Sequence, residues 1–137
     1  MSSNTTSPSK ALHIGLWVLQ ILLAFMFLMA GASKFFTPLE AQRTSMEWAK
    51  HASDAVIYIA GLAEILGGLG LILPSLLRIM PWLTSIAALG LAIVMLIATA
   101  LNISIGESKA IMPTILISGI ALFVAWGRYK KAPISAK

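Results

Sequence analysis

Long apolar runs separated by short polar stretches dominate the chain. Four runs stand out, at 11–32, 55–77, 79–101 and 111–126. Each is close to the roughly 17–25 residues that a helix needs to cross a bilayer, and none shows the strict alternation of a barrel strand. Because a helix satisfies its own backbone hydrogen bonds in lipid, the pattern predicts an all-α fold, an integral membrane four-helix bundle.

Turn and capping residues support these boundaries. Pro81 and Pro113 fit the first turns of the third and fourth predicted helices, where a missing N–H costs no hydrogen bond. Ser53 and Asp54 offer an N-cap for the second helix. Each prediction implies a helix that begins near the start of its apolar run.

The polar segment 33–54 is long for a connection between neighbouring helices. Thr37 and Glu40 have the spacing of a capping box, and Pro38 suits a first helical position. We therefore expect a short extracytoplasmic helix between the first two spans. It is either an amphipathic helix in the membrane interface or a lid over a site.

Composition points to lipid rather than water around the helices. The 137-residue chain suits one domain; it is 58% hydrophobic and 11% charged, against about a quarter charged in soluble domains. We divide it into a disordered polar N-terminus (1–10), a membrane domain (11–128) and a basic C-terminal tail (129–137). The absence of cysteine excludes a thiolate metal site; we expect no metal and no nucleic acid.

Basic residues divide unequally between the two ends of the predicted bundle. With four crossings, both termini share a side with the turn between the second and third helices. That side holds six Lys and Arg and no acid, against four Lys and Arg on the other side. The positive-inside rule therefore predicts cytoplasmic termini. Arg128, Trp126 and Trp82 are expected to anchor the membrane interface at this side.

Glu64 is a carboxylic acid in the middle of an apolar run. It lies nine residues past Ala55, or about 14 Å into a core of roughly 30 Å. An ionised carboxylate there costs about 2.5–3.5 kcal/mol, so we expect Glu64 to face the bundle and to be protonated, paired or both. Gln20, predicted at a similar depth on the first helix, and Lys34, at the outer end of that helix, are the candidate partners.

Two interpretations of Glu64 remain open. It either pins helix packing through a hydrogen bond, or it relays protons or contacts a ligand, as intramembrane carboxyls commonly do. Nearby glycines either allow close helix approach or make room for a ligand. The candidate ligand-binding residues are Glu64, Lys34, Gln20, Gly61, Gly67 and Asn102.

Several short segments resemble the DoxX family and its DoxX-like relatives, small bacterial proteins with four spanning helices. They are Gly31-Ala32-Ser33-Lys34, Gly61-Leu62-Ala63-Glu64, Gly67-Gly68-Leu69-Gly70-Leu71, Gly106-Glu107 and Gly127-Arg128. Asn102 stands where many relatives carry a histidine, so a role that depends on that histidine does not transfer. The resemblance implies a multi-pass protein of the bacterial inner membrane, and ties to quinone-linked oxidoreductases, redox-stress complexes or receptor assembly.

Three functions follow from these observations. The favoured one is a quinone- or lipid-binding subunit of a membrane oxidoreductase or redox-stress complex, in which Glu64 moves a proton and Lys34 or Gln20 binds a ring oxygen. A partner then supplies the electrons, because the chain has no cysteine and no nucleotide motif. The alternatives are a non-catalytic assembly factor that binds the transmembrane helices of a partner, and a small proton-coupled transporter. The expected partners are the lipid bilayer and either a membrane oxidoreductase or further copies of the chain.

Overall fold

The computed structural model describes residues 10–135, and four long helices dominate it. Each of the four is long and apolar enough to span a membrane, which confirms the predicted all-α membrane fold. They are α1 (Lys10–Phe36), α3 (Asp54–Leu77), α4 (Leu83–Ile105) and α5 (Ser108–Trp126). The shorter elements are α2 (Leu39–Ser45), the 3₁₀ helix η2 (Glu47–His51) and a final wide turn, η3 (Gly127–Lys131).

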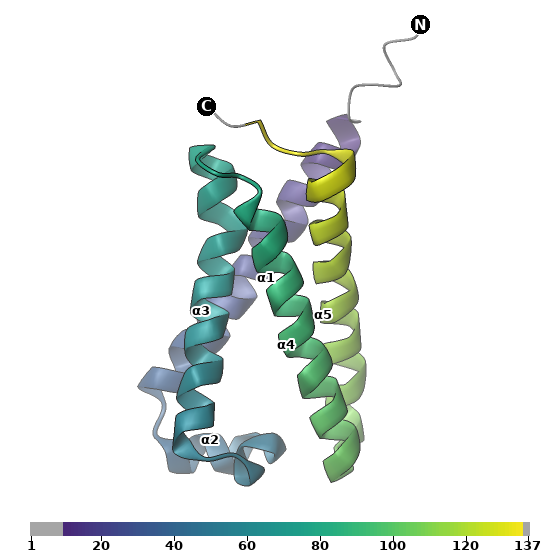
Figure 1. Cartoon of the computed structure of the whole chain (residues 1–137). Coiled ribbons are helices and arrows are strands. Elements are labelled where there is room, and N and C mark those ends of the chain that lie inside the picture. Colours follow the sequence, from purple (N-terminus) through teal and green to yellow (C-terminus); the bar gives the residue numbers. More distant parts are fainter. Residues whose placement is uncertain (1–9, 136–137) are drawn as a thin grey trace, which may run out of the picture.

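The long helices form two antiparallel pairs. The helix α1 packs along α3, α4 packs along α5, and α3 contacts α4 (Figure 1). The ends of the described chain and the α3–α4 turn lie at one end of the bundle, and α2 lies at the other. The helices α3 and α4 diverge toward the α2 end. We call the two ends the terminal end and the α2 end.

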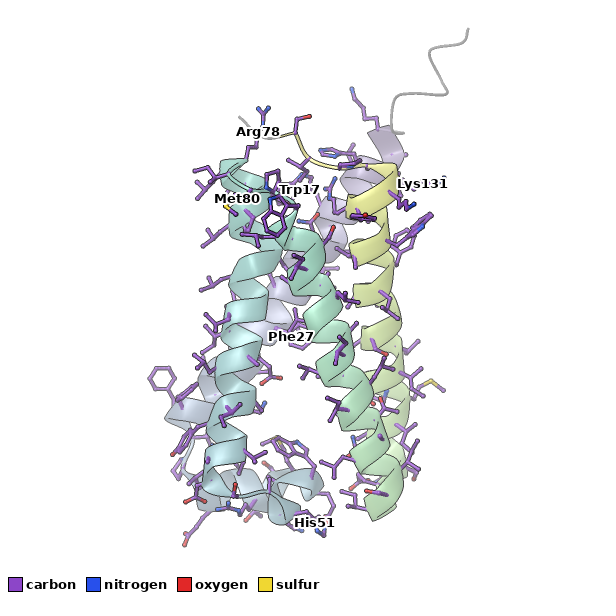
Figure 2. The ribbon with its side chains drawn as sticks, viewed as in Figure 1. Trp17, Phe27, His51, Arg78, Met80 and Lys131 are labelled. Carbon is purple, nitrogen blue, oxygen red and sulfur yellow. The ribbon has the colours of Figure 1, made fainter. Side chains whose placement is uncertain are left out.

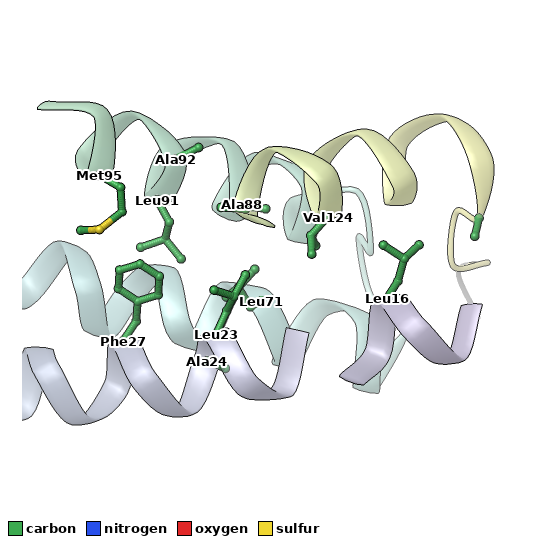
Figure 3. Packing of buried hydrophobic residues seen from close by; sticks show 12 residues of the cluster. Leu16, Leu23, Ala24, Phe27, Leu71, Ala88, Leu91, Ala92, Met95 and Val124 are labelled. Atoms are coloured by element: carbon green, nitrogen blue, oxygen red, sulfur yellow. The ribbon is translucent and has the colours of Figure 1, made fainter. Parts of the chain in front are cut away.

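Apolar side chains fill the bundle where the two pairs meet. Phe27 of α1 lies opposite Leu91 of α4, and Leu71 of α3 and Val124 of α5 are fully buried nearby (Figure 3). The outward faces of the same helices carry large exposed apolar side chains, among them Phe25, Leu66, Ile97 and Leu116. So large an apolar exterior is stable in a lipid bilayer, and the chain is an integral membrane protein.

Glycines allow α1 and α3 to pack with their backbones close together. A Cβ atom on Gly31 would lie 2.7 Å from the Gly61 carbonyl oxygen, and one on Gly61 would lie 2.9 Å from the Lys34 Cβ. Gly67 instead receives the Leu91 side chain of α4, which would lie 2.5 Å from an added Cβ. These contacts give both candidate glycines a packing role.

The two proline predictions are wrong. The helix α4 begins only at Leu83, because Arg78 and Met80 take positive φ angles of 57° and 48° and turn the chain before Pro81 can enter a helix. The helix α5 begins at Ser108, ahead of its apolar run, so Pro113 lies inside the helix rather than in its first turn.

The connection between α1 and α3 is helical, but it is not capped as predicted. The helix α2 begins after Pro38 and has no side-chain cap, so the Thr37–Glu40 capping box is wrong. Gln42 instead donates from Nε2 to the carbonyl oxygens of Lys34, at 2.9 Å, and Thr37, at 2.8 Å. A side chain of α2 thereby satisfies carbonyls at the end of α1.

Both ends of the described chain are tied to helices. The polar segment predicted over residues 1–10 lies outside the described residues except for Lys10, which begins α1. At the other end, helical structure continues through η3, and Arg78 donates from Nε to the Ser135 carbonyl at 2.8 Å. The end of the described chain thus contacts the α3–α4 turn.

A candidate ligand site between the helix pairs

Lys34 and Glu64 form an ion pair inside the bundle. Lys34 Nζ lies 2.6 Å from Glu64 Oε1, and the two residues are 7% and 6% exposed. Gly61 explains how they meet, because its missing side chain lets the Lys34 Cβ approach α3 one turn before Glu64. The extended lysine side chain then spans that turn. Of the two candidate partners of Glu64, Lys34 is the one in contact.

Gln20 lies elsewhere, which corrects the prediction of equal depth. Its Nε2 donates to the Leu71 carbonyl at 2.7 Å, and its Oε1 accepts from Arg128 Nε at 2.6 Å. Leu71 is seven residues beyond Glu64, which is about 10 Å along α3. The prediction assumed that both helices begin at one level, whereas Lys34, near the end of α1, lies beside Gly61, well inside α3.

A cavity of about 800 Å³ opens where the two helix pairs diverge. This lies within the range of roughly 300–1,000 Å³ typical of small-molecule sites. Lys34, Glu64, Asn102 and Thr114 contribute polar groups to its wall. The apolar wall comes mainly from α3 and α4: Val56, Ala60, Val94, Met95, Ile97, Ala98 and Leu101. A small apolar body with a polar head matches this lining.

The connection between α1 and α3 covers one end of the cavity. Trp48 and His51 of η2 line it, and Lys34 Nζ lies 5.8 Å from the centre of the Trp48 ring. Figure 2 shows His51 at the α2 end of the bundle. Arg43 holds this connection in place by donating to the carbonyls of Ala49 and Ala52. These contacts favour the lid interpretation of the segment.

Asn102 brings an unused hydrogen-bond acceptor to the cavity. Its backbone carbonyl accepts from the Gly106 and Glu107 amides at the end of α4. The residue is 3% exposed, and its side-chain Oδ1 has no hydrogen-bond partner among residues 10–135. An unpaired buried acceptor costs about 1–3 kcal/mol, so this oxygen is a natural contact for a ligand that donates a hydrogen bond.

Arg128 forms a second polar cluster, at the terminal end. It is 4% exposed and donates from Nε to Gln20 Oε1 and from Nη1 to the Ala132 carbonyl at 2.8 Å. Its Nη1 also lies 2.9 Å from His13 Nδ1, and its guanidinium carbon lies 5.7 Å from the centre of the Trp17 ring. Arg128 therefore joins α1 to the end of α5 instead of extending freely into the interface.

The remaining predicted anchors lie near the terminal end, and the structure adds one unexpected residue to each polar cluster. Trp82 and Trp126 are 53% and 47% exposed near the terminal end. His13 and Trp48 had no predicted role beside these groups. The contact of His13 with Arg128 could have been expected from the antiparallel topology, because it places the start of α1 beside the end of α5. No pattern in the sequence pointed to the contact of Trp48 with Lys34.

One family model matches most of the chain. The DoxX-like family model matches residues 18–126, a span that contains Lys34, Glu64 and Asn102. Comparison with curated proteins gives no match, and comparison with solved structures gives none either. Because the matched span covers well over half of the sequence and all four long helices contribute to it, the chain belongs to the DoxX-like family.

Proposed function

We propose that the protein is a quinone- or lipid-binding subunit that works with a membrane oxidoreductase or a redox-stress complex. The observation that carries this proposal is the Lys34–Glu64 ion pair on the wall of an apolar cavity. A buried ion pair adds little stability compared with well-packed apolar residues. Its position beside a space large enough for a ring system therefore favours ligand binding over packing.

Lys34 and Glu64 have different roles in binding the head group of the ligand. The Lys34 ammonium has three N–H donors and pairs with Glu64. No other acceptor within residues 10–135 engages it, so a donor is left for a ring oxygen. Glu64 holds or releases a proton beside that oxygen. A bound quinone supplies two-electron chemistry coupled to protons. The chain has no cysteine, and a partner protein supplies the electrons.

Binding of duroquinone to the purified protein in nanodiscs tests the proposal. Tryptophan fluorescence should be quenched on binding, because Trp48 lines the cavity. Lys34→Met should weaken binding about tenfold, the effect of losing one hydrogen bond to a charged donor. Lys109→Met is the matched control, since Lys109 is exposed at the cavity rim and should not matter. Absence of saturable binding, or equal binding by both variants, would refute the proposal.

Infrared difference spectroscopy tests the proton role of Glu64. Duroquinone binding should shift a carboxyl band in the wild type, and Glu64→Gln should remove that band while leaving the fold intact. Glu107→Gln, another acid on the cavity wall, is the control and should keep the band. A band that is unmoved by the ligand in wild-type protein would remove Glu64 from the proposed chemistry.

The protein is proposed to lie in the inner membrane of a bacterium, with its terminal end facing the cytoplasm. Arg78 and Lys131 both lie at this end (Figure 2), and Lys130 adds to the basic surface there. Cysteines introduced singly at the exposed positions Ser135 and Ser108 should react with a membrane-impermeant reagent from opposite sides of the membrane. Reaction of both from one side would overturn the orientation.

A groove on the outer face of α3 and α4 supports a second candidate, an assembly factor that binds another protein's transmembrane helix. The groove measures about 300 Å³ and is lined by small residues, including Ala63, Ala87 and Gly90. A Cβ on Gly90 would meet no atom within 4 Å, which leaves room for a closely packed helix. Gly90→Leu should then release a stoichiometric membrane partner in pull-downs, whereas Lys34→Met should retain it.

A further inference from the structure

The side chain of Asn102 adds a hydrogen-bond acceptor that can distinguish between ligands with and without a hydroxyl group, which the ion pair alone does not do. We infer that the site binds the reduced, hydroxyl-bearing form of its head group more tightly than the oxidised form, with Asn102 Oδ1 accepting a hydrogen bond from the ligand hydroxyl. The inference rests on the proposed function, because it concerns the same cavity. It specifies the ligand class as a neutral quinol or phenol on an apolar body.

Asn102 is held in place independently of any ligand. It lies in the last turn of α4, where its backbone carbonyl accepts from the Glu107 amide at 2.9 Å. Gly106 ends the helix in a left-handed conformation with φ of 78°, which suits glycine. The fixed helix end therefore holds Asn102 at a defined place on the cavity wall.

The hydroxyl groups on this wall already have partners. The Thr114 hydroxyl is engaged by its own helix, with the Ala110 carbonyl at 2.9 Å, and by Thr99. The Ser53 hydroxyl caps α3, and the Ser45 hydroxyl donates to the Gln42 carbonyl. Within residues 10–135, Asn102 Oδ1 is the cavity-wall acceptor that is buried and lacks a donor, apart from the carboxylate that faces Lys34.

The charges on the wall indicate a neutral head group. Lys34 and Glu64 cancel each other at 2.6 Å, so the buried part of the cavity offers no net charge to a ligand. The pair still offers N–H donors from Lys34 and carboxylate oxygens from Glu64. A neutral ligand that both donates and accepts hydrogen bonds satisfies all of these groups.

The oxidation state of the ligand decides whether Asn102 is satisfied. A quinone has two carbonyl acceptors and no donor, so it leaves Oδ1 unpaired in a site that has lost its water. A quinol has two O–H donors and can fill this acceptor. Sites built to pair with a hydroxyl discriminate strongly against analogues that lack it.

Three ligands that share one tetramethyl ring test the inference on the wild-type protein. Duroquinol, duroquinone and the dimethyl ether of duroquinol are titrated anaerobically into protein in nanodiscs, with tryptophan fluorescence as the readout. We expect duroquinol to bind about tenfold more tightly than either of the others, the effect of pairing one buried acceptor. Equal affinities, or tighter binding of duroquinone, would overturn the inference while leaving the proposed function intact. Absence of binding by all three would overturn both.

Two variants then assign the preference to Asn102. Asn102→Leu keeps the size of the side chain and removes its polar atoms, so duroquinol should lose its advantage while duroquinone binds as before. Thr114→Val is the matched control on the same wall, and it should keep the full preference. A preference that survives in Asn102→Leu would refute the assignment. The wild-type ligand series decides the main inference even where Asn102→Leu fails to fold.

Discussion

The two polar clusters inside this bundle differ in how completely their groups are paired. At the terminal end, Gln20 and Arg128 bond to each other and to backbone carbonyls of Leu71 and Ala132. At the α2 end, the Lys34–Glu64 pair faces a cavity whose wall also carries the unpaired Asn102 oxygen. Both clusters are buried, but one is surrounded by protein and the other by space for a ligand.

This difference separates a structural cluster from a candidate site. Gln20 and Arg128 join α1, α3 and the end of α5, and the chain of contacts continues through Ser75 to Thr84, 2.6 Å apart across the α3–α4 turn. Fully satisfied networks of this kind fix the positions of helices. At the α2 end, no side-chain hydrogen bond joins α3 to α4 within residues 10–135, and the two helices diverge there (Figure 1). Burial of a polar residue in a membrane helix is therefore a weaker sign of function than burial beside a cavity.

The largest effect should come from breaking the ion pair on one side. Glu64→Leu leaves the Lys34 ammonium buried without a partner, which should lower the free energy of unfolding by about 3 kcal/mol. Adding Lys34→Met should recover most of this loss, because two apolar side chains replace a buried pair at little cost. Unfolding in mixed micelles measures both variants.

The double variant separates stability from ligand binding. Lys34→Met with Glu64→Leu should be nearly as stable as the wild type and should bind duroquinone weakly. A double variant that is stable and also binds normally would show that the pair serves neither purpose, and would remove the contrast between the two clusters.

Arg128→Met should have the next largest effect on stability. In contrast to the double variant, it should lose stability and keep its ligand binding. It removes the donor to Gln20 and to the Ala132 carbonyl, at a cost of about 2–3 kcal/mol in unfolding free energy. Duroquinone affinity should stay unchanged, because Arg128 does not line the cavity. Lys130→Met, at an exposed neighbouring position, controls for the loss of positive charge. Weakened ligand binding in Arg128→Met would show that the two ends are coupled.

The close contact between α1 and α3 should respond to a single methyl group. Gly61→Ala places a Cβ 2.9 Å from the Lys34 Cβ and should cost about 1–3 kcal/mol through overpacking. It should also weaken duroquinone binding, because Lys34 must move. Gly90→Ala is the control, with no atom within 4 Å of its added Cβ. Equal stability of the two variants would show that the α1–α3 contact is looser than the structure indicates.

The lengths of the hydrophobic runs were sufficient to predict the fold but not the relative level of the helices. The four spans follow from run length alone, and α1, α3, α4 and α5 confirm them. The predicted depth of Gln20 was wrong because it was counted from the ends of the apolar runs. The actual level depends on where small residues let backbones meet, as Gly31 and Gly61 do. That information lies in packing between two helices, which a single run does not contain.

The candidate site was only partly accessible from the sequence. Glu64 stood out because a carboxylate in an apolar run is costly. Lys34 was a candidate partner at the outer end of the first helix, although the predicted depths left it well above Glu64. Trp48 and Thr114 carried no such signal, since their place on the cavity wall depends on how the α1–α3 connection folds back and how α5 packs. The unpaired state of Asn102 Oδ1 is likewise visible only when its neighbours are known.

The smallest effects should distinguish the two predicted helix caps near the α2 end. The Ser53 hydroxyl accepts from the Val56 amide at 3.3 Å, so Ser53→Ala should cost about 1 kcal/mol and speed hydrogen exchange in the first turn of α3. Thr37→Ala should change neither quantity, because no side chain caps α2. The hydrogen bond from Gln42 to the Thr37 carbonyl survives the substitution, since the backbone supplies the acceptor.

Hydrogen exchange measured by mass spectrometry across both segments compares the variants directly. Faster exchange in α2 of Thr37→Ala would restore the capping box, and unchanged exchange in Ser53→Ala would remove the α3 cap.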